Sequence, residues 1–412
     1  MVSRFEFFEE KLKPRMVNGE LIMKTGYKRT EIGVIPVDWE IKELGKIGFL
    51  KNGINKSKED FGFGYPFVNL MDVFGKSRIR GNEELDLINS NDTERNLYNL
   101  EKGDVIFIRS SVKPSGVGLT TVIYKDLPDT VYSGFLIRFR ETGFLNLNFK
   151  EHCFHQEGFR NRLVANSTVS ANTNINQEAL KKLFLVIPPL PEQKAIAKVL
   201  SDTDNLIQAL EKRIAKKRLI KQGAMQKLLS PKDDWEVKKL GEIFNISVGG
   251  DLIKEAFSLT KDEKHPYPIY SNALTKKGLY GFSEIYRHEE NCITVTARGM
   301  VGVANKRDHK FDAIGRVLIL RPISAISCFF MSEFINHKIE FSIESTGVPQ
   351  LTAPQISKYE IKFPIKEKQT HIATILSEMD SEIEALEKKR AKYQLLKQGL
   401  MQNLLTGKIR LI

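Results

Sequence analysis

The chain has 412 residues, which is enough for two or three domains with cores of their own. Hydrophobic residues make up 41% and charged residues 28%, as in a soluble globular protein, and no apolar run reaches the roughly 18 residues of a membrane span. The net charge of +12 favours an acidic partner, most often nucleic acid, while three scattered cysteines argue against a disulfide framework. The opening sequence MVSRFEFFEEKLKPR lacks a signal-peptide core, so we expect a cytoplasmic protein.

The first part of the chain predicts a domain of mixed helices and strands. Residues 1–30 are predicted as an N-terminal extension, and the domain follows over 31–187. Strand character is clearest in DVIFIRSS (Asp104–Ser111) and SGFLIRFR (Ser133–Arg140), which Gly, Pro and Asn punctuate. QEALKKLFLVIPP (Gln177–Pro189) predicts a short helix followed by a strand that the two prolines stop.

The second part of the chain repeats this order. A long helix is predicted over 188–230, a second mixed domain over 231–363, and a second long helix over 364–412. The strands of the second domain are predicted in NCITVTAR (Asn291–Arg298) and GRVLILRP (Gly315–Pro322). The fold class is therefore α+β or mixed α/β, with two similar globular domains joined by two long helices.

An internal repeat relates the two halves. Laying residues 188–229 on 364–405 without a gap gives 22 identities in 42 positions. Each half also opens on a Trp-Glu pair, in PVDWEIKELGKI (Pro36–Ile47) and PKDDWEVKKLGEI (Pro231–Ile243). The sequences between these similar ends differ. This indicates two related domains whose ends have been kept and whose middle parts have diverged.

An apolar seven-residue period runs through both long helices, as in one strand of a coiled coil. We expect the following positions, with two repeated glycines, to contact another helix or a partner: Leu200, Ile207, Leu210, Ile214, Gly223, Leu376, Ile383, Leu386 and Gly399. Packing against its own domain is the alternative, but about 38 residues of helix span roughly 57 Å, more than a small domain's width. Because each glycine costs about 1 kcal/mol relative to alanine, its recurrence indicates either close approach of another helix or a local kink.

No complete catalytic pattern is present. Gly75–Ser77 lacks the upstream glycine of a phosphate-binding loop, and FGFGYP (Phe61–Pro66) is not followed by the helix that a cofactor-binding turn needs. IPPLP (Ile187–Pro191) lacks the Asn or Asp with which an amino-methyltransferase holds its target. HCFH (His152–His155) has no second pair of ligands, and a closed zinc site takes about four. We therefore expect no catalytic residue, no metal and no cofactor.

Two stretches without acidic residues, Val105–Lys125 and Asn291–Arg307, combine a predicted strand, a glycine-containing turn and basic residues. Arg and Lys can bind guanine edges or phosphates, and Asn can bind adenine. Arg109 and Arg298 end predicted strands in the same manner, so we expect them to contact bases, whereas the lysines suit phosphates. The candidate DNA-binding residues are Lys76, Arg78, Arg80, Arg109, Ser110, Lys113, Asn272, Lys276, Lys277, Arg298 and Lys306. The alternative for each residue is an ordinary solvated loop.

Taken together, a series of fragments resembles the specificity (S) subunit of type I restriction–modification systems. PPLPEQ followed by a long helix is the most specific of them, and FPIKEKQ (Phe363–Gln369) departs from it in the second half. The resemblance covers nearly the whole chain beyond its first 25 residues or so. The fragments are Tyr27–Gly45, Tyr65–Ile79, Gly103–Ser111, Asn172–Asp204 and Tyr267–Phe282.

The resemblance implies a non-catalytic subunit with two target-recognition domains, each recognising one half of a bipartite site in double-stranded DNA. It implies that the long helices pair antiparallel under an internal pseudo-twofold repeat, set the separation of the half-sites, and dock two methyltransferase (M) subunits. S-adenosylmethionine is then expected on the methyltransferase, and restriction or motor (R) subunits can join the assembly. A DNA-modifying enzyme in its own right and a coiled-coil scaffold without a DNA role are the alternatives.

Overall fold

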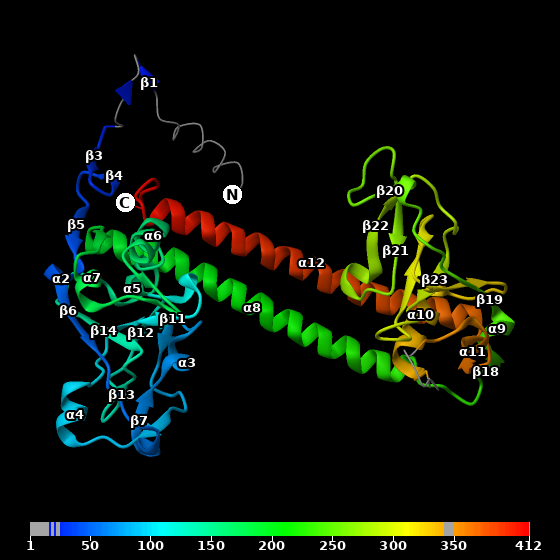
Figure 1. Cartoon of the computed structure of the whole chain (residues 1–412), viewed down its shortest axis with the longest axis horizontal. Coiled ribbons are helices and arrows are strands. Elements are labelled where there is room, and N and C mark those ends of the chain that lie inside the picture. The colour runs from blue at the N-terminus through cyan, green and yellow to red at the C-terminus, as the bar shows by residue number, and fades with distance from the viewer. Residues whose placement is uncertain (1–15, 18–19, 22–24, 342–349, 412) are drawn as a thin grey trace. The chain divides into compact units, whose positions relative to one another are not determined.

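The structure, a computed structural model, describes residues 16–17, 20–21, 25–341 and 350–411 (Figure 1). The chain divides into two compact units: unit 1 comprises Met1–Ala209 with Arg390–Ile412, and unit 2 comprises Leu210–Lys389. Two helices of 39 residues each, α8 (Leu190–Leu228) and α12 (Lys366–Leu404), contribute to both units. In the part of the chain that the structure describes, no helix is long and apolar enough to cross a membrane.

Unit 1 is built around a five-stranded sheet in the order β6-β14-β10-β12-β8. These strands span Gly48–Asn52, Leu136–Glu141, Val105–Ile108, Thr120–Ile123 and Arg78–Ile79. Helices α5 (Leu147–Cys153) and α6 (Glu157–Ala165) share a core with one face of this sheet. A smaller sheet, β13-β7-β9, shares a core with the other face; it consists of Val131–Tyr132, Phe61–Val68 and Asp86–Ile88.

The central strand β10 is apolar at all four positions because both faces of the sheet are covered. Val105 and Phe107 pack in the core that contains α5 and α6, while Ile106 and Ile108 pack in the core that contains β7. The predicted strand DVIFIRSS is present but divides at Arg109. Its last two residues form the short β11 (Ser110–Ser111), which pairs with β16. The remaining short elements of unit 1 include β3 (Tyr27–Thr30), β4 (Gly33–Pro36), α3 (Leu70–Val73), α4 (Asp92–Leu97), β15 (Thr168–Val169) and β16 (Thr173–Asn174).

Unit 2 repeats this architecture. Its main sheet has the order β19-β26-β23-β24, and these strands span Phe244–Val248, Leu318–Pro322, Cys292–Val295 and Ala304–Arg307. Helix α10 (Cys328–Lys338) packs against β23 and β24. The smaller sheet, β20-β22-β21-β25, consists of Phe257–Ser258, Leu279–Ser283, Tyr267–Tyr270 and Asp312–Ala313. The predicted strands in 291–298 and 315–322 are thus present at the centre of this unit.

The repeated ends of each half form one compact piece. In unit 1, β5 (Glu40–Glu43) pairs with β17 (Phe184–Ile187), and in unit 2, β18 (Glu236–Lys239) pairs with β27 (Glu360–Phe363). Two short helices meet beside each strand pair: α2 (Leu44–Ile47) with α7 (Gln177–Lys181), and α9 (Leu240–Ile243) with α11 (Ala353–Ser357). A Cβ at the repeated glycines Gly45 and Gly241 would lie 3.0 Å from the Cβ atoms of Lys181 and Ser357, which is closer than ordinary van der Waals contact, so a side chain here would push the helices apart by a few tenths of an ångström.

The glutamine that ends PPLPEQ and FPIKEKQ makes equivalent hydrogen bonds in the two units. Gln193 accepts a hydrogen bond from the backbone N–H of Asn146 at 2.8 Å, and Gln369 accepts one from that of Ser327 at 2.9 Å. Asn146 and Ser327 are the N-cap residues of α5 and α10, respectively. Each glutamine also donates to the proline carbonyl five residues before it. The motif therefore fixes the start of the long helix to the start of a domain helix.

The second copy of this motif has Lys368 where the first has Glu192, and the hydrogen bonds around the repeated tryptophan differ accordingly. In unit 1 the buried carboxylate of Glu192 accepts from the indole N–H of Trp39 at 2.8 Å and from Arg410 at 2.7 Å. At the equivalent position in unit 2, Lys368 pairs instead with Asp234 at 3.3 Å. The buried indole N–H of Trp235 then has no hydrogen-bond partner among the described residues.

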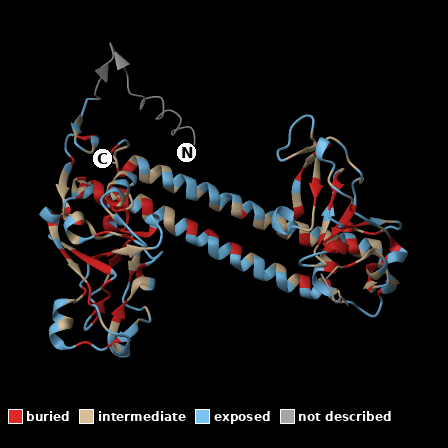
Figure 2. Ribbon diagram, viewed as in Figure 1, coloured by how far each residue is buried: buried red, intermediate tan, exposed pale blue. Residues whose placement is uncertain are grey.

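Helices α8 and α12 run antiparallel, as predicted (Figure 1). Within unit 2, Lys217 pairs with Glu382 and Lys221 pairs with Asp380. Residue numbers therefore rise along α8 where they fall along α12, as in an antiparallel pair. Most of the surface of both helices is exposed, with buried residues recurring along one side (Figure 2). Of the predicted contact positions, Ile383 is half-buried, and the following are buried: Leu200, Ile207, Leu210, Ile214, Leu376 and Leu386.

The two repeated glycines of the helices do not lie at the contact between them. A Cβ built on Gly223 or Gly399 would have no described atom within 4 Å. The prediction that they mark close approach of the other helix of this chain is therefore wrong. Both glycines fall within continuous helices and face open space, so a role in docking a partner stays a prediction.

Candidate nucleic-acid interface

Arg109 lies directly after β10, and packing fixes its backbone. Its N–H donates to the carbonyl of Phe135 at 2.8 Å, and its own carbonyl accepts from Ile175 at 2.9 Å. The guanidinium is half-buried and donates through Nη1 to the carbonyl of Gly134 at 3.2 Å. Because a guanidinium carries about five N–H donors, this contact orients Arg109 without using most of its hydrogen-bonding capacity.

Arg298 does not occupy the place of Arg109. The carbonyl of Arg109 accepts a hydrogen bond from the N–H of Ile175, and the carbonyl of Ala297 accepts one from Leu351, the repeat equivalent of Ile175. Ala297 is therefore the counterpart of Arg109, and Arg298 is the next residue along the chain. Successive side chains along a strand point to opposite faces. The prediction that both arginines end their strands in the same manner is therefore wrong. Arg298 is exposed and donates to Oε1 of Gln350 at 2.9 and 3.1 Å.

Arg78 has a structural partner. Its Nη2 lies 2.7 Å from Oε2 of Glu151, whose side chain is almost completely buried, and its guanidinium lies over the ring of Tyr124 at 5.2 Å. An uncompensated buried carboxylate would be strongly destabilising, so neutralising Glu151 explains this arginine without DNA. The neighbouring candidates Lys76 and Arg80 are exposed, and Nζ of Lys76 lies 3.8 Å from Asp72.

Asn272 also has a structural role. Its Oδ1 accepts from the N–H of Ala297 at 2.7 Å, and its Nδ2 donates to the carbonyl of Gly315 at 2.6 Å. The side chain thus ties the loop after β21 to the end of β23, and both ends of the amide that would bind adenine are engaged. A sequence motif cannot distinguish this tie from a base contact, because both use an asparagine in a loop.

The remaining basic candidates are exposed on loops and at strand ends. Lys276 and Lys277 have φ values of 49° and 54°, a left-handed conformation that is uncommon outside glycine and that makes a sharp turn here. Lys306 on β24 pairs with Asp308 at 2.8 Å. Lys113 is exposed, and Ser110 is half-buried on β11. Exposed ammonium groups of this kind suit phosphates, which require no fixed geometry.

A hollow of about 560 Å³ opens beside Ser110 and Lys113. Four of the large apolar side chains that line it are exposed, and none was singled out from the sequence: Met71, Phe74, Val112 and Phe135. The available signal was the position of Val112, an apolar residue between a serine and a lysine in a loop without acids. We call these four residues, with the space they line, the apolar hollow.

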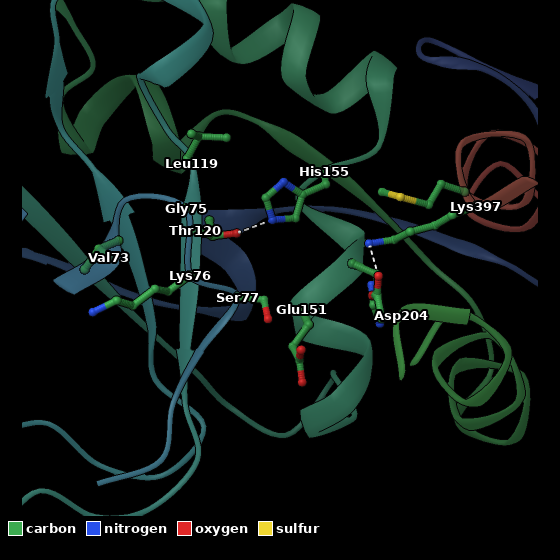
Figure 3. A pocket seen from close by; sticks show the side chains of 12 residues that line it. Val73, Gly75, Lys76, Ser77, Leu119, Thr120, Glu151, His155, Asp204 and Lys397 are labelled. Atoms are coloured by element: carbon green, nitrogen blue, oxygen red, sulfur yellow. Dashed lines mark hydrogen bonds and ion pairs between the residues drawn. The ribbon is translucent and has the colours of Figure 1, made fainter. Parts of the chain in front are cut away.

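The HCFH motif lies at a second, smaller hollow of about 330 Å³ in unit 1. Figure 3 shows His155 beside Thr120, with Asp204 of α8 and Lys397 of α12 across the space. Nε2 of His155 lies 3.3 Å from Oγ1 of Thr120. Among the described residues, no group of three His, Cys, Asp or Glu side chains could hold a metal ion.

His152 is buried and His155 is half-buried, and both rings are neutral. Desolvation is the main cause that lowers the pKa of His152 to about 3 and that of His155 to about 4, and nearby positive charges, Lys397 among them, contribute to both shifts. Nε2 of His152 lies 3.5 Å from the hydroxyl of Ser201 on α8. The two rings therefore act as packing groups between the domain and the helices.

An exposed apolar pair recurs on the outer surface of both long helices. Leu219 and Ile220 of α8 are equivalent in the repeat to Leu395 and Leu396 of α12, and all four are exposed. Leu219 and Leu395 are each 69% exposed. Gly223 and Gly399 follow one helical turn later, and a Cβ on either would face unoccupied space. Each unit therefore contributes one exposed apolar surface next to a glycine. We call these the repeated helix surfaces.

Comparison with known proteins agrees with these features. The family described as "Type I restriction modification DNA specificity domain" matches residues 36–218 and 232–394. The putative type I restriction enzyme MjaX specificity subunit of Methanocaldococcus jannaschii is 28% identical over 93% of this chain and 96% of its own length. The crystal structure of a type I restriction–modification system S subunit from M. genitalium superposes with a TM-score of 0.59 at 18% identity, covering 93% of this chain and 98% of that one.

A further solved structure describes complex assembly and conformational transition of the type I R-M system. It superposes with a TM-score of 0.56 at 13% identity and covers 91% of this chain and 99% of its own. At these identities the two solved structures show a shared fold. The two matched segments cover most of the chain and include the main sheet of each unit. The chain therefore belongs to the family of type I restriction modification DNA specificity domains, of which it carries two copies.

Proposed function

We propose that this chain is the DNA-recognition subunit of a type I restriction–modification enzyme, with each unit recognising one half of a bipartite site in double-stranded DNA. The observation that carries the proposal is the repetition of one architecture with different loops. The strand orders β6-β14-β10-β12 and β19-β26-β23-β24 match, while the residues after β10 and β23 differ. Two related scaffolds with unlike loops suit two unlike half-sites.

Within each unit, base and phosphate contacts are assigned by how firmly a side chain is held. Arg109 is oriented by the carbonyl of Gly134, and Arg298 is oriented by Gln350. An oriented guanidinium can form a bidentate pair with guanine, worth about 1–3 kcal/mol of discrimination. Lys113, Lys276 and Lys277 are exposed on loops and suit phosphates.

Methyl transfer is assigned to partner subunits rather than to this chain. The repeated helix surfaces support this assignment, because two equivalent apolar surfaces on one chain suit two copies of one partner. We propose methyltransferase subunits as these partners, with S-adenosylmethionine bound to them and no cofactor on the specificity subunit. Restriction or motor subunits would then join the same assembly.

A domain exchange tests the proposed function. Residues 36–187 are replaced by the matching domain of another specificity subunit, and the exchanged chain is expressed with a methyltransferase subunit in cells without other methylation. Sequencing of modified DNA should show a motif in which one half has changed and the other has not. A motif changed in both halves, or in neither, would contradict recognition by separate units, and methyl transfer by the isolated chain would contradict its non-catalytic role.

A further inference from the structure

The apolar hollow of unit 1 brings together three segments that are distant in sequence. Met71 and Phe74 come from α3 and the residue after it, Val112 comes from the loop after β11, and Phe135 comes from the turn before β14. Val112 is 80% exposed, the highest value among the large apolar residues that the structure describes. A large apolar surface that is left exposed in a folded domain usually marks a binding site.

The neighbourhood of the hollow is basic. Arg109 is held next to Phe135, since its N–H donates to the carbonyl of that residue, and Lys113 is part of the lining. None of the described residues that line the hollow is acidic. An apolar surface bordered by Arg and Lys and without carboxylates complements a polyanion that also presents apolar groups, which describes the groove of DNA.

Unit 2 exposes an apolar residue in the corresponding loop. Gln350 is bridged to Arg298 as Asn174 is paired with Ser110, and Met300 follows this pairing by two residues, as Val112 does. The loop of unit 2 is shorter, since the carbonyl of Thr296 accepts from Gly302 whereas that of Ile108 accepts from Gly118. Met300 is 63% exposed, and its loop also lacks acids. The two diverged domains thus each expose an apolar side chain in the corresponding loop, and the loops differ in length while the side chains differ in size and shape.

We propose that Val112 and Met300 each contact the C5-methyl group of a thymine in the major groove, and that the apolar hollow receives this methyl in unit 1. The inference rests on the proposed DNA recognition and adds to it a base type for each half-site. Apolar contact is the means by which proteins distinguish the thymine methyl in the major groove. Removing that methyl while leaving base pairing intact is therefore the most direct probe.

The experiment uses the full chain with its methyltransferase partner and duplexes that carry the motif found by sequencing of modified DNA. Each thymine of a half-site is replaced in turn by deoxyuridine, which lacks the methyl, and affinity is measured by fluorescence anisotropy. At one thymine in each half-site the replacement should weaken binding about fourfold, the effect of withdrawing one buried methyl. The Val112→Ala variant should bind duplexes with thymine or deoxyuridine in the first half-site equally well. The Val112→Ile variant, which keeps a branched apolar side chain, should still prefer thymine.

Matched controls separate this contact from a general effect. Val169 of unit 1 is 74% exposed and lies outside the lining of the hollow, so Val169→Ala should keep the preference for thymine. Met300→Ala should abolish the preference in the second half-site only. Loss of assembly with the methyltransferase in Val112→Ala would overturn the inference in favour of a protein contact.

Two further outcomes would overturn the inference while the proposed function stands. One is a recognised half-site without an A·T pair, and the other is a motif in which no deoxyuridine replacement changes affinity. A chain that assembles with its partner and binds all sequences equally would instead overturn the proposed function, and the thymine contact with it. The two failures are therefore distinguishable in one set of measurements.

Discussion

The carboxylate of Asp204 and the ammonium of Lys397 lie 2.6 Å apart and join α8 to α12 within unit 1. The residues equivalent to them in the repeat, Asp380 and Lys221, form the same pair at 2.6 Å within unit 2. Lys221 and Lys397 interrupt the apolar period of their helices, and each lies opposite an aspartate of the other helix. A polar position in an apolar helix contact specifies register and orientation at a cost in stability.

The first prediction concerns this pair. Asp204→Lys should place two ammonium groups together and lower the free energy of unfolding, and the exchange Asp204→Lys with Lys397→Asp should recover most of the loss. A coupling energy of about 0.5–1 kcal/mol is expected, since both side chains are partly exposed. Urea denaturation of the four chains of this double-mutant cycle measures it. A coupling near zero would show that the pair makes no net contribution to the stability of the contact between the helices.

The second prediction concerns pH. His152 and His155 have a lower pKa in the folded chain than the ordinary value of 6.5, because burial penalises the charged ring. Their contribution to stability is complete above about pH 6.5 and is lost as pH falls towards 4, because the unfolded chain then binds more protons. The loss between pH 7.5 and 5 should be about 2 kcal/mol for each histidine, since pH 5 lies about 1.5 units below the unfolded pKa and above both folded values.

The measurement is the urea midpoint of unfolding at both pH values. His155→Gln should flatten the pH dependence, since a neutral side chain that can still pair with Thr120 replaces the titrating ring. The exposed His371 provides the control, because His371→Gln should leave the pH dependence as it is. An unchanged slope in His155→Gln would contradict the assignment.

The third prediction separates base from phosphate contacts. Arg109→Ala or Arg298→Ala should relax the preference at one base pair of one half-site by about 1–3 kcal/mol. Lys276→Ala should weaken binding to all sequences alike and reduce the salt dependence by about one phosphate contact. Binding to single-base variants of the motif at several salt concentrations distinguishes the two classes. Lys46, exposed on α2, provides a basic control that should show neither effect.

The fourth prediction concerns partner docking by the repeated helix surfaces. Leu219→Glu and Leu395→Glu should each reduce the assembly from two methyltransferase subunits to one, and the double variant should bind none, because a charge would be buried in an apolar contact. Native mass spectrometry of the co-expressed complex counts the subunits. Leu259→Glu introduces the same charge at another exposed leucine and should leave two subunits bound. Full assembly in the double variant would place the partner elsewhere.

Local patterns explain why so much of the fold is visible in the sequence. Each long helix has a seven-residue apolar period, and β10 and β23 are short apolar runs between turns, so their type follows from nearby residues alone. The repeat adds an internal alignment: Gly45 and Gly241, or Gln193 and Gln369, recur because they serve the same contact twice. The division into two domains rests on these recurring segments, whereas the antiparallel pairing of the helices was expected from the family resemblance.

The candidate site was less predictable, because it depends on which distant segments meet. Arg78 is engaged by Glu151, 73 residues later, and Asn272 is engaged by Ala297 and Gly315, so two basic or polar candidates proved to have structural partners. The one-residue offset between Arg109 and Arg298 comes from the pairing of their strands. The gathering of Met71, Phe74, Val112 and Phe135 likewise belongs to the tertiary structure.

The sequence alone thus determined the repeat, the long helices, the central strands and the family resemblance, since these are carried by neighbouring residues and by recurrence along the chain. The tertiary structure decided which charged groups are neutralised, which face a side chain takes and which apolar residues remain exposed together. Those properties are set by hydrogen bonds, ion pairs and packing between residues far apart in the chain, and no local pattern records them.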